Sequence, residues 1–385
     1  MKVGAGISAG LRSPQSAAEA ARSAARGLGG ADADLAVVFA SGAHLDEPEA
    51  VLAAVDRELA PGVLVGCGAG GVLGAGRELE SGTGVAVWAA SLQGGRARGF
   101  HATVSGEANG GVLDGLPELG TDAALIMLSD PYSFPTDAVL DGIARQAPGV
   151  AVLGGLSSAR SPLGGAALFT GDGVHRSGAV GVCLNGVEML PCVSQGAAPL
   201  GREMTITAAQ DNVIHELAGR PAVEAIEQTI AELPLDERAL VAAGLLIGIV
   251  VDGGKPEYEQ GDFLVRGVLG ADSETGSVSV GTRVATGQVV RLHARDASSA
   301  DADLRRELRV RAAAIGGRPP AGALVFSCNG RGQQMFGACD HDASVVAQEL
   351  GDAPAAGFFA AGEIGPVGGR SFLHGFTATI AVFPG

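Results

Sequence analysis

Apolar runs alternate with amphipathic segments along most of the chain, and this pattern predicts an α/β fold. The run at 35–41 (LAVVFAS) predicts a buried strand, and the amphipathic segment at 47–59 predicts a helix after it. The apolar run at 63–71 ends in a glycine turn, and another apolar run follows at 84–92. This part of the chain is therefore expected to form a strand, a helix, a second strand, a glycine turn and a further strand.

The same order recurs twice, which predicts an internal repeat. The second copy has its strand, helix, glycine-ended strand and later strand at 123–130, 135–147, 150–158 and 178–184. The third copy has them at 323–329, 341–350, 355–365 and 374–383. Because β-α-β crossovers are parallel and strand–turn–strand segments are antiparallel, we expect repeated β-α-β-β units forming mixed β-sheets covered by helices.

Helix boundaries and a different central stretch complete the picture. Ser13 before Pro14 predicts an N-cap for the first helix. Other helices are expected at 219–234 and 301–315, the latter charged and with a solvated outer face. The end of a helix followed by a strand is expected at 240–251, and strand runs are expected at 261–297. With 385 residues the chain is longer than a typical single core, so we expect two domains, at 1–195 and 196–385.

Composition excludes several classes of function. The net charge of −16 opposes binding to nucleic acid, whose phosphates require clustered Lys and Arg. Five cysteines without compact spacing argue against a disulfide framework and fit a reducing compartment. The longest apolar run, near 239–251, is shorter than the ~20 residues of a membrane span. We expect a cytoplasmic protein with no membrane contact.

Two motif-like features carry little chemistry. The glycines at 66–71 (GCGAGG) lack the helix that must follow in a dinucleotide-binding loop, and the next residues predict a hairpin or loop instead. Cys328, Cys339 and His341 lack the paired short spacing of structural zinc sites, so no metal is expected.

Reactive side chains concentrate in the third copy. Cys328, Asn329 and Arg331 follow a predicted strand end, the place where open α/β sheets bind ligands. Further along the chain, Glu363 lies in a glycine turn, and Arg370 and His374 flank a strand start. His341 is a further candidate, although His341-Asp342 at the start of a helix is also explained as a helix cap or first turn.

The C-terminal motifs resemble those of the FIST family. The resemblance rests on FSCNGRG (326–332), MFG (335–337), HDA (341–343) and the segment from 356 to 383, and it extends to LAVVFAS (35–41), VGCGAGG (65–71) and GGLSSA (154–159). It implies a FIST N-terminal domain, a FIST C-terminal domain and a sensory signal-transduction role in which a small ligand such as an amino acid is bound. Since no output domain is evident, it also implies a separate output partner.

The leading hypothesis is therefore a stand-alone intracellular sensor. Arg331 and Arg370 would bind a carboxylate, Glu363 an amino group, and Asn329 and His374 would orient the ligand, with Cys328 and His341 also in the site. One alternative is a cysteine-dependent hydrolase or transferase that uses Cys328, Glu363 and His374. Another, implied by the family, is a haem-binding nitric oxide sensor with His101 or His374 as axial ligand; otherwise no cofactor is expected.

Overall fold

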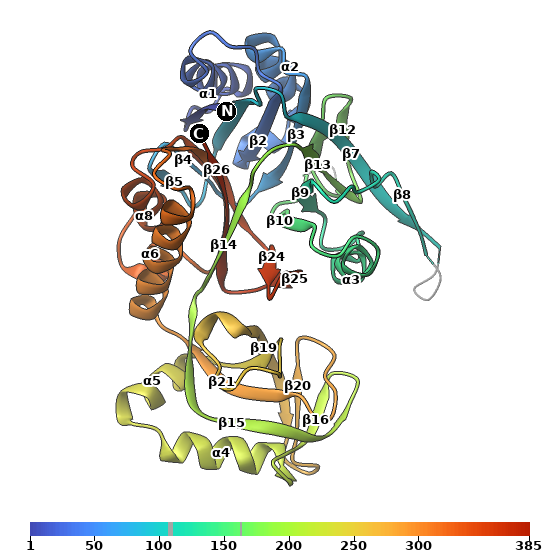
Figure 1. Ribbon diagram of the computed structural model, residues 1–385, viewed down its shortest axis with the longest axis vertical. Coiled ribbons are helices and arrows are strands. Elements are labelled where there is room, and N and C mark those ends of the chain that lie inside the picture. The colour runs from blue at the N-terminus through green and yellow to red at the C-terminus, as the bar shows by residue number, and fades with distance from the viewer. Residues whose placement is uncertain (107–110, 162–163) are drawn as a thin grey trace. The chain divides into compact units, whose positions relative to one another are not determined.

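The computed structural model in Figure 1 describes residues 1–106, 111–161 and 164–385. The chain divides into two units: Met1–Val193 with Leu304–Leu373 and Ala378–Gly385, and Ser194–Asp303 with His374–Thr377. Both contain helices and β-sheet, so the predicted α/β class with mixed sheets and two domains is confirmed. The third copy of the repeat lies in the first unit with the other two copies.

The internal repeat is confirmed by three sheets with the same strand order. The first copy consists of β2 (Leu35–Ser41), α2 (Pro48–Leu59), β3 (Val63–Ala69) and β6 (Gly84–Ser91). The second consists of β9 (Ala123–Ser129), α3 (Thr136–Gln146), β10 (Ala151–Leu156) and β13 (Ala179–Asn185). The third consists of β22 (Pro320–Cys328), α8 (His341–Glu349), β23 (Ala355–Ala360) and β26 (Thr377–Pro384). In each copy the first two strands are parallel, and the last strand pairs antiparallel with the first.

A strand that precedes each copy extends its sheet. These strands are β1 (Lys2–Ser8), β7 (Arg96–Ser105) and β14 (Leu190–Gln195), and each lies beside the last strand of its own copy. The first and third copies also have a helix before their first strand, α1 (Ser13–Gly27) and α6 (Ala297–Ala314). The N-cap of α1 is Arg12, not Ser13 as predicted, because the Ser13 hydroxyl contacts His44 Nδ1 at 3.0 Å instead of capping the helix.

The opposite edge of each sheet is completed by a hairpin from another copy, which we call an exchanged hairpin. The first copy supplies β4 (Val72–Gly74) and β5 (Arg77–Leu79) to β23. The second supplies β11 (Leu168–Thr170) and β12 (Gly173–His175) to β3. The third supplies β24 (Glu363–Val367) and β25 (Arg370–His374) to β10. The exchange is cyclic, so all three copies are tied together by backbone hydrogen bonds.

The second strand of each copy contains a glycine at the same place, and these three glycines align the three copies residue by residue. A Cβ added to Gly66, Gly154 or Gly357 would lie 1.8 to 1.9 Å from a carbonyl oxygen of the adjacent first strand, so only glycine allows this approach. The residues opposite these glycines on the exchanged hairpins are Phe169, Ile364 and Leu73. Positions in the three hairpins can therefore be compared one by one.

Inner faces of the three sheets share one apolar core. Phe39, Phe326 and Phe358 come from three strands and two copies, and their rings pack within 6.5 Å of one another. Trp88 and Phe383 belong to the same cluster. The outer faces carry the helices, which is why alanine-rich α1 buries Ala17, Ala20, Ala21 and Ala24.

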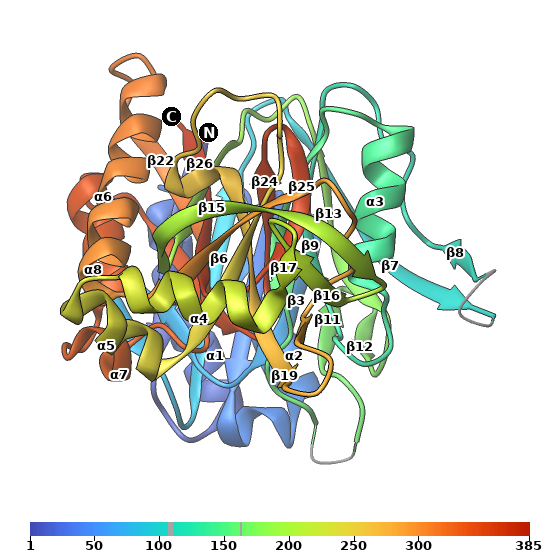
Figure 2. The same ribbon diagram turned by 90° about the horizontal axis from the view of Figure 1, so that it is seen from below.

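The second unit is built around a separate antiparallel sheet. Its strands in spatial order are β15 (Ala197–Gln210), β21 (Val289–Arg295), β18 (Leu245–Val250), β19 (Phe263–Asp272), β20 (Ser277–Val280), β16 (Val213–Leu217) and β17 (Arg220–Pro221). Helix α4 (Ala222–Glu232) packs on this sheet, and α5 (Leu235–Ala243) follows it (Figure 2). The helix expected at 219–234, the helix end and strand expected at 240–251, and the strand runs expected at 261–297 are confirmed.

Candidate functional site

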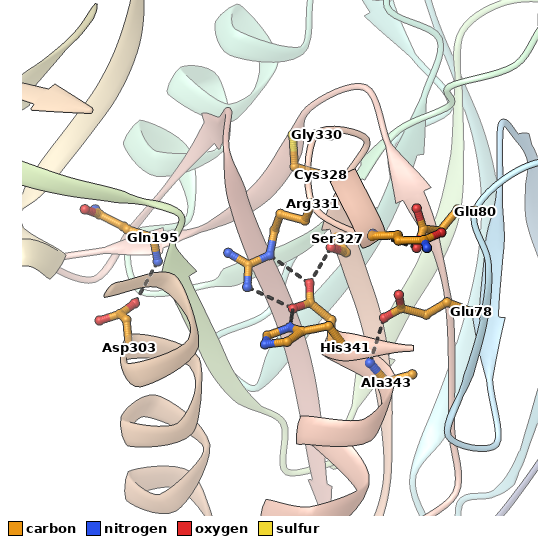
Figure 3. Close-up of polar contacts among 12 residues, drawn as sticks. Glu78, Glu80, Gln195, Asp303, Ser327, Cys328, Gly330, Arg331, His341 and Ala343 are labelled. Carbon is orange, nitrogen blue, oxygen red and sulfur yellow. Dashed lines mark hydrogen bonds and ion pairs between the residues drawn. The ribbon is translucent and has the colours of Figure 1, made fainter. Parts of the chain in front are cut away.

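A buried ion pair lies where β22 ends and α8 begins. Arg331 Nε and Nη2 donate to Asp342 Oδ2 and Oδ1 at 2.7 and 2.9 Å, a two-point contact in which both residues are only 2% exposed. The Ser327 hydroxyl donates to Asp342 Oδ2 at 2.7 Å, and His341 Nδ1 lies 3.0 Å from Oδ1. Figure 3 shows Ser327, Arg331 and His341 converging on this one carboxylate. Asp342 is thus the centre of the network.

Electrostatics keep the pair charged. Burial alone would raise the pKa of Asp342, but Arg331, His341 and Ser327 together hold that pKa well below its usual range. Burial would lower the pKa of Arg331, yet Asp342, and to a smaller extent Cys328 and Glu363, raise it. A charged, doubly bonded pair in the interior is rigid, and it fixes the loop between β22 and α8.

Aromatic contacts cover the pair. The ring of Phe336, at the end of the short helix α7 (Gln333–Phe336), lies beneath the guanidinium of Arg331, with Cζ 5.1 Å from the ring centroid. The imidazole of His341 stacks on the same ring, with the two ring centroids 3.5 Å apart and the ring planes 6° from parallel. Cation–π and stacking contacts of this kind position Arg331 and His341 as well as shielding them from water.

One edge of the Arg331 guanidinium, at Nη1, makes no hydrogen bond within the described part of the chain. This nitrogen is also buried. A buried donor left in this state is costly, and such groups in native proteins are commonly explained by a ligand, an ion or water. The contributions of Cys328 and Glu363 to the pKa of Arg331 place both side chains within electrostatic reach of the guanidinium.

Glu363 occupies a position that the fold makes apolar. It lies on β24 immediately before Ile364, and the equivalent residues of the other two exchanged hairpins are Val72 and Leu168. All three side chains are fully buried. Since the scaffold needs only an aliphatic residue here, a buried carboxylate in the third copy requires an explanation beyond folding.

The exchanged hairpin of the first copy supplies two more carboxylates. Glu78 Oε1 accepts from the Ala343 backbone N–H at 2.8 Å, and the Glu78 backbone N–H donates to Asp340 Oδ1 at 2.5 Å. Glu80 Oε1 accepts from Gln333 N–H at 2.8 Å (Figure 3). These bonds fasten β5 and the residue after it to both helices of the β22–α8 connection.

Burial dominates the chemistry of Glu78. It raises the pKa of Glu78 to about 7; the Ala343 N–H opposes this rise, and the carboxylates of Asp342, Glu80 and Asp340 add to it. Glu78 Oε2 is buried and has no hydrogen-bond partner within the described part of the chain. This carboxyl group therefore changes charge near neutral pH, immediately beside the first turn of α8.

The predicted site residues are placed as follows. Cys328, partly exposed, ends β22 and accepts a hydrogen bond from Gly330 N–H at 3.4 Å, while Asn329 is exposed. Arg370 is also exposed and forms an ion pair with Asp141 at 2.5 Å. His374 is buried and belongs to the second unit.

Of the two helix positions expected for Asp342, cap or first turn, the structure shows the first turn. The N-cap of α8 is Asp340, in the left-handed region at φ 59°, and its side chain makes no capping hydrogen bond. The carboxylate of Asp342 is instead the partner of Arg331. The short spacing from Arg331 to Asp342 was visible in the sequence and could have suggested this pair, whereas nothing there indicated Glu78 or Glu80.

His101, one of the two candidate axial ligands, lies beside a second imidazole. Its ring stacks on that of His175 with the ring centroids 3.8 Å apart, and its Nε2 lies 2.9 Å from the Ser177 carbonyl oxygen. A cavity of about 290 Å³ lies beside the two rings, and Thr170 Oγ1 contacts His175 Nε2. Within the described residues, no three His, Cys, Asp or Glu side chains are grouped to hold a metal ion.

Comparison with known proteins identifies the class. Residues 34–220 match the FIST N domain and residues 222–366 match the FIST C domain, so this chain belongs to the FIST family, as its C-terminal motifs predict. FIST domains are associated with sensory and signal-transduction proteins. Among the helices of residues 1–106, 111–161 and 164–385, none is both long and apolar enough to span a membrane.

Mycobacterial proteins are similar over the full length. An uncharacterized protein of Mycobacterium tuberculosis strain H37Rv is 43% identical over 384 residues, which covers 100% of both chains. An uncharacterized protein of Mycobacterium bovis is also 43% identical over 384 residues, covering 100% of this chain and 99% of the relative. The similarity therefore extends through both domains.

Proposed function

We propose that this chain is a sensory protein whose small ligand, an amino acid or a similar zwitterion, binds beside Arg331. The observation that carries the proposal is the buried Nη1 of Arg331, for which the described protein offers no acceptor. A guanidinium edge is suited to a carboxylate, which can accept its hydrogen bonds at a fixed geometry. The other edge is held by Asp342, so a ligand would meet a donor that is already oriented.

Glu363 supports a ligand that also carries a positive charge. Its carboxylate lies within electrostatic reach of Arg331 and stands where the other two copies have Val72 and Leu168. A ligand ammonium group would be attracted to Glu363, and a ligand carboxylate to Arg331. Asn329 and Cys328, at the end of β22, are further candidates for contact with the ligand, as are His341, Arg370 and His374. The signal would pass to a separate output protein.

Calorimetric titration with a panel of amino acids tests this proposal. Glu363→Val replaces the carboxylate with the residue of the first copy, so the variant should fold while losing affinity for the ligand. Arg370→Ala removes an exposed arginine and decides whether this residue belongs to the site. Equal binding by wild type and Glu363→Val, or no binding of any panel member to the wild type, would refute the proposal.

Cysteine chemistry is a second candidate because the Cys328 sulfur accepts a hydrogen bond from Gly330 N–H at 3.4 Å and lies within electrostatic reach of Arg331. Both interactions favour a thiolate, the nucleophilic form. In a hydrolase or transferase, Cys328 would attack the substrate, with Glu363 and His374 as assisting groups. Iodoacetamide labelling across pH measures the reactivity: rapid labelling well below pH ~8.5 supports this function, and slow labelling there counts against it.

A further inference from the structure

A cavity of about 620 Å³ lies beside α3, far along the chain from the residues around Arg331. Its walls come from α3, from the loop at 131–135 before that helix, and from the region of β7 and β8 (Val112–Asp114). Pockets of several hundred Å³ with mainly apolar walls are typical of small-molecule sites. The residues that line this cavity belong to the second copy of the repeat, so a ligand bound there is independent of the site proposed around Arg331.

The cavity has a structural origin in the repeat. In the first copy, α1 packs against α2, with Ala17 and Ala21 in one apolar cluster with Val51 and Val55. In the third copy, α6 likewise packs on α8: Leu304 and Leu308 share a cluster with Val345 and Val346. In the second copy, the described residues between β7 and β9 form only the short strand β8. Helix α1 covers α2 and helix α6 covers α8, but no equivalent helix in the described residues covers α3.

Gly142 deepens the cavity. The sequence Val51-Leu52-Ala53-Ala54-Val55 of α2 matches Val139-Leu140-Asp141-Gly142-Ile143 of α3, so Gly142 takes the place of Ala54. Ala54 is buried in the cluster beneath α1, whereas a Cβ on Gly142 would meet no atom within 4 Å. Glycine inside a helix is unfavourable, and here it leaves open space on the wall of the cavity.

Apolar side chains surround the opening. Tyr132 and Leu113 line the cavity and are 76% and 38% exposed, and the neighbouring Val112 is 65% exposed. These are three of the seven large apolar side chains that are exposed in the described part of the chain. Such clustering of apolar surface marks a binding site more often than isolated exposed residues do.

The lining selects an uncharged ligand. Among the lining residues that the structure describes, none is Asp, Glu, Lys, Arg or His, and the polar side chains are those of Tyr132, Ser133 and Gln146. The Ser133 hydroxyl already donates to Asp130 and accepts from Gly178 N–H. The guanidinium of Arg160 lies over the Tyr132 ring, with Cζ 4.5 Å from the ring centroid, but Arg160 is not among the described lining residues. We propose that this cavity is a second ligand site, which binds a small, neutral, apolar molecule.

Fluorescence titration with N-phenylnaphthylamine, a neutral apolar probe, tests the site. We expect saturable binding of one equivalent to the wild type, and a loss of affinity of roughly tenfold or more in Gly142→Leu, whose side chain extends into the cavity and takes up space that the ligand needs. Ala53→Leu adds a leucine to the exposed face of α2 and serves as the matched control, with unchanged binding. The unfolding temperature of Gly142→Leu should not fall, because leucine favours the helix more than glycine does.

Two further probes separate the alternatives. Anilinonaphthalene sulfonate has the same aromatic frame with a negative charge, and we expect it to bind at least roughly tenfold more weakly, because none of the described lining residues is a cation. A peptide of residues 13–27 represents the helix that covers the equivalent place in the first copy. The proposal is overturned if the neutral probe does not bind saturably, if folded Gly142→Leu binds it as the wild type does, or if the peptide binds and the neutral probe does not.

Discussion

Glu78 makes the stability of the first unit depend on pH, and one substitution removes this dependence. Burial raises the pKa of its carboxyl group from 4.5 to about 7 in the folded protein. Between these two values the folded state binds more protons than the unfolded state, so stability falls as pH rises through this window. Above pH ~7 the folded protein keeps the full cost of an ionised, buried carboxylate.

The size of the effect follows from the two pKa values. One pKa unit corresponds to about 1.4 kcal/mol, so the charge on Glu78 costs about 3 kcal/mol above neutral pH. In Glu78→Gln the side-chain oxygen can still accept from the Ala343 N–H, and no charge forms. We therefore expect the variant to be more stable than the wild type by up to about 3 kcal/mol near pH 8, and by much less near pH 5.

Urea unfolding followed by tryptophan fluorescence measures this difference. Trp88 is the single tryptophan of the chain and is fully buried in the core of the first unit, so its emission reports on that unit. Glu118→Gln, which neutralises an exposed carboxylate, is the control for the change in net charge. An advantage of Glu78→Gln that is the same at both pH values, or a variant less stable than wild type near pH 8, would refute the reasoning.

Two further predictions concern the same unit. Asp342→Ala leaves the Arg331 guanidinium buried without its carboxylate and should lower the free energy of unfolding by about 3–5 kcal/mol. The double variant Asp342→Ala with Arg331→Met should lose less stability than the two single variants added together. A double-mutant cycle measured by urea unfolding checks this, and simple additivity would contradict it. Gly357→Ala places a Cβ 1.8 Å from the Val325 carbonyl oxygen and should destabilise the unit by about 1–3 kcal/mol. Gly142→Ala should not destabilise it, because a Cβ there meets no atom within 4 Å. Thermal unfolding compares the two variants, and equal effects would show that the close approach at Gly357 is not the cause.

Strands could be predicted from the sequence where both of their faces are buried, because burial requires an apolar residue at every position. Strands such as β2 and β9 are buried at every position, and a continuous apolar run indicates this directly. The exchange of hairpins was not predictable: β4 has three residues, and Val72 and Leu73 suit the edge of any of the three sheets. Short strands are paired by tertiary packing, which a local pattern does not record.

The candidate site shows the same limit. A carboxylate at the start of a helix fits a cap equally well, and only the fold brings Arg331 against Asp342. Glu78 was missed because its partner Ala343 lies 265 residues away in the chain. Arg370 lies on β25 at the edge of its sheet, with its side chain on the surface beside Asp141, and its neighbours in the sequence do not indicate this ion pair.

Cyclic exchange of hairpins has a consequence for synthesis of the chain on the ribosome. The hairpin of β4 and β5 is complete at Leu79, but the strand that it joins, β23, begins only at Ala355. At about 5–20 residues per second, the hairpin waits on the order of ten seconds or longer for its sheet. During that time the side chains of Val72 and Leu73, fully buried in the finished protein, have no partner strand, and the nascent chain presents a natural target for chaperones.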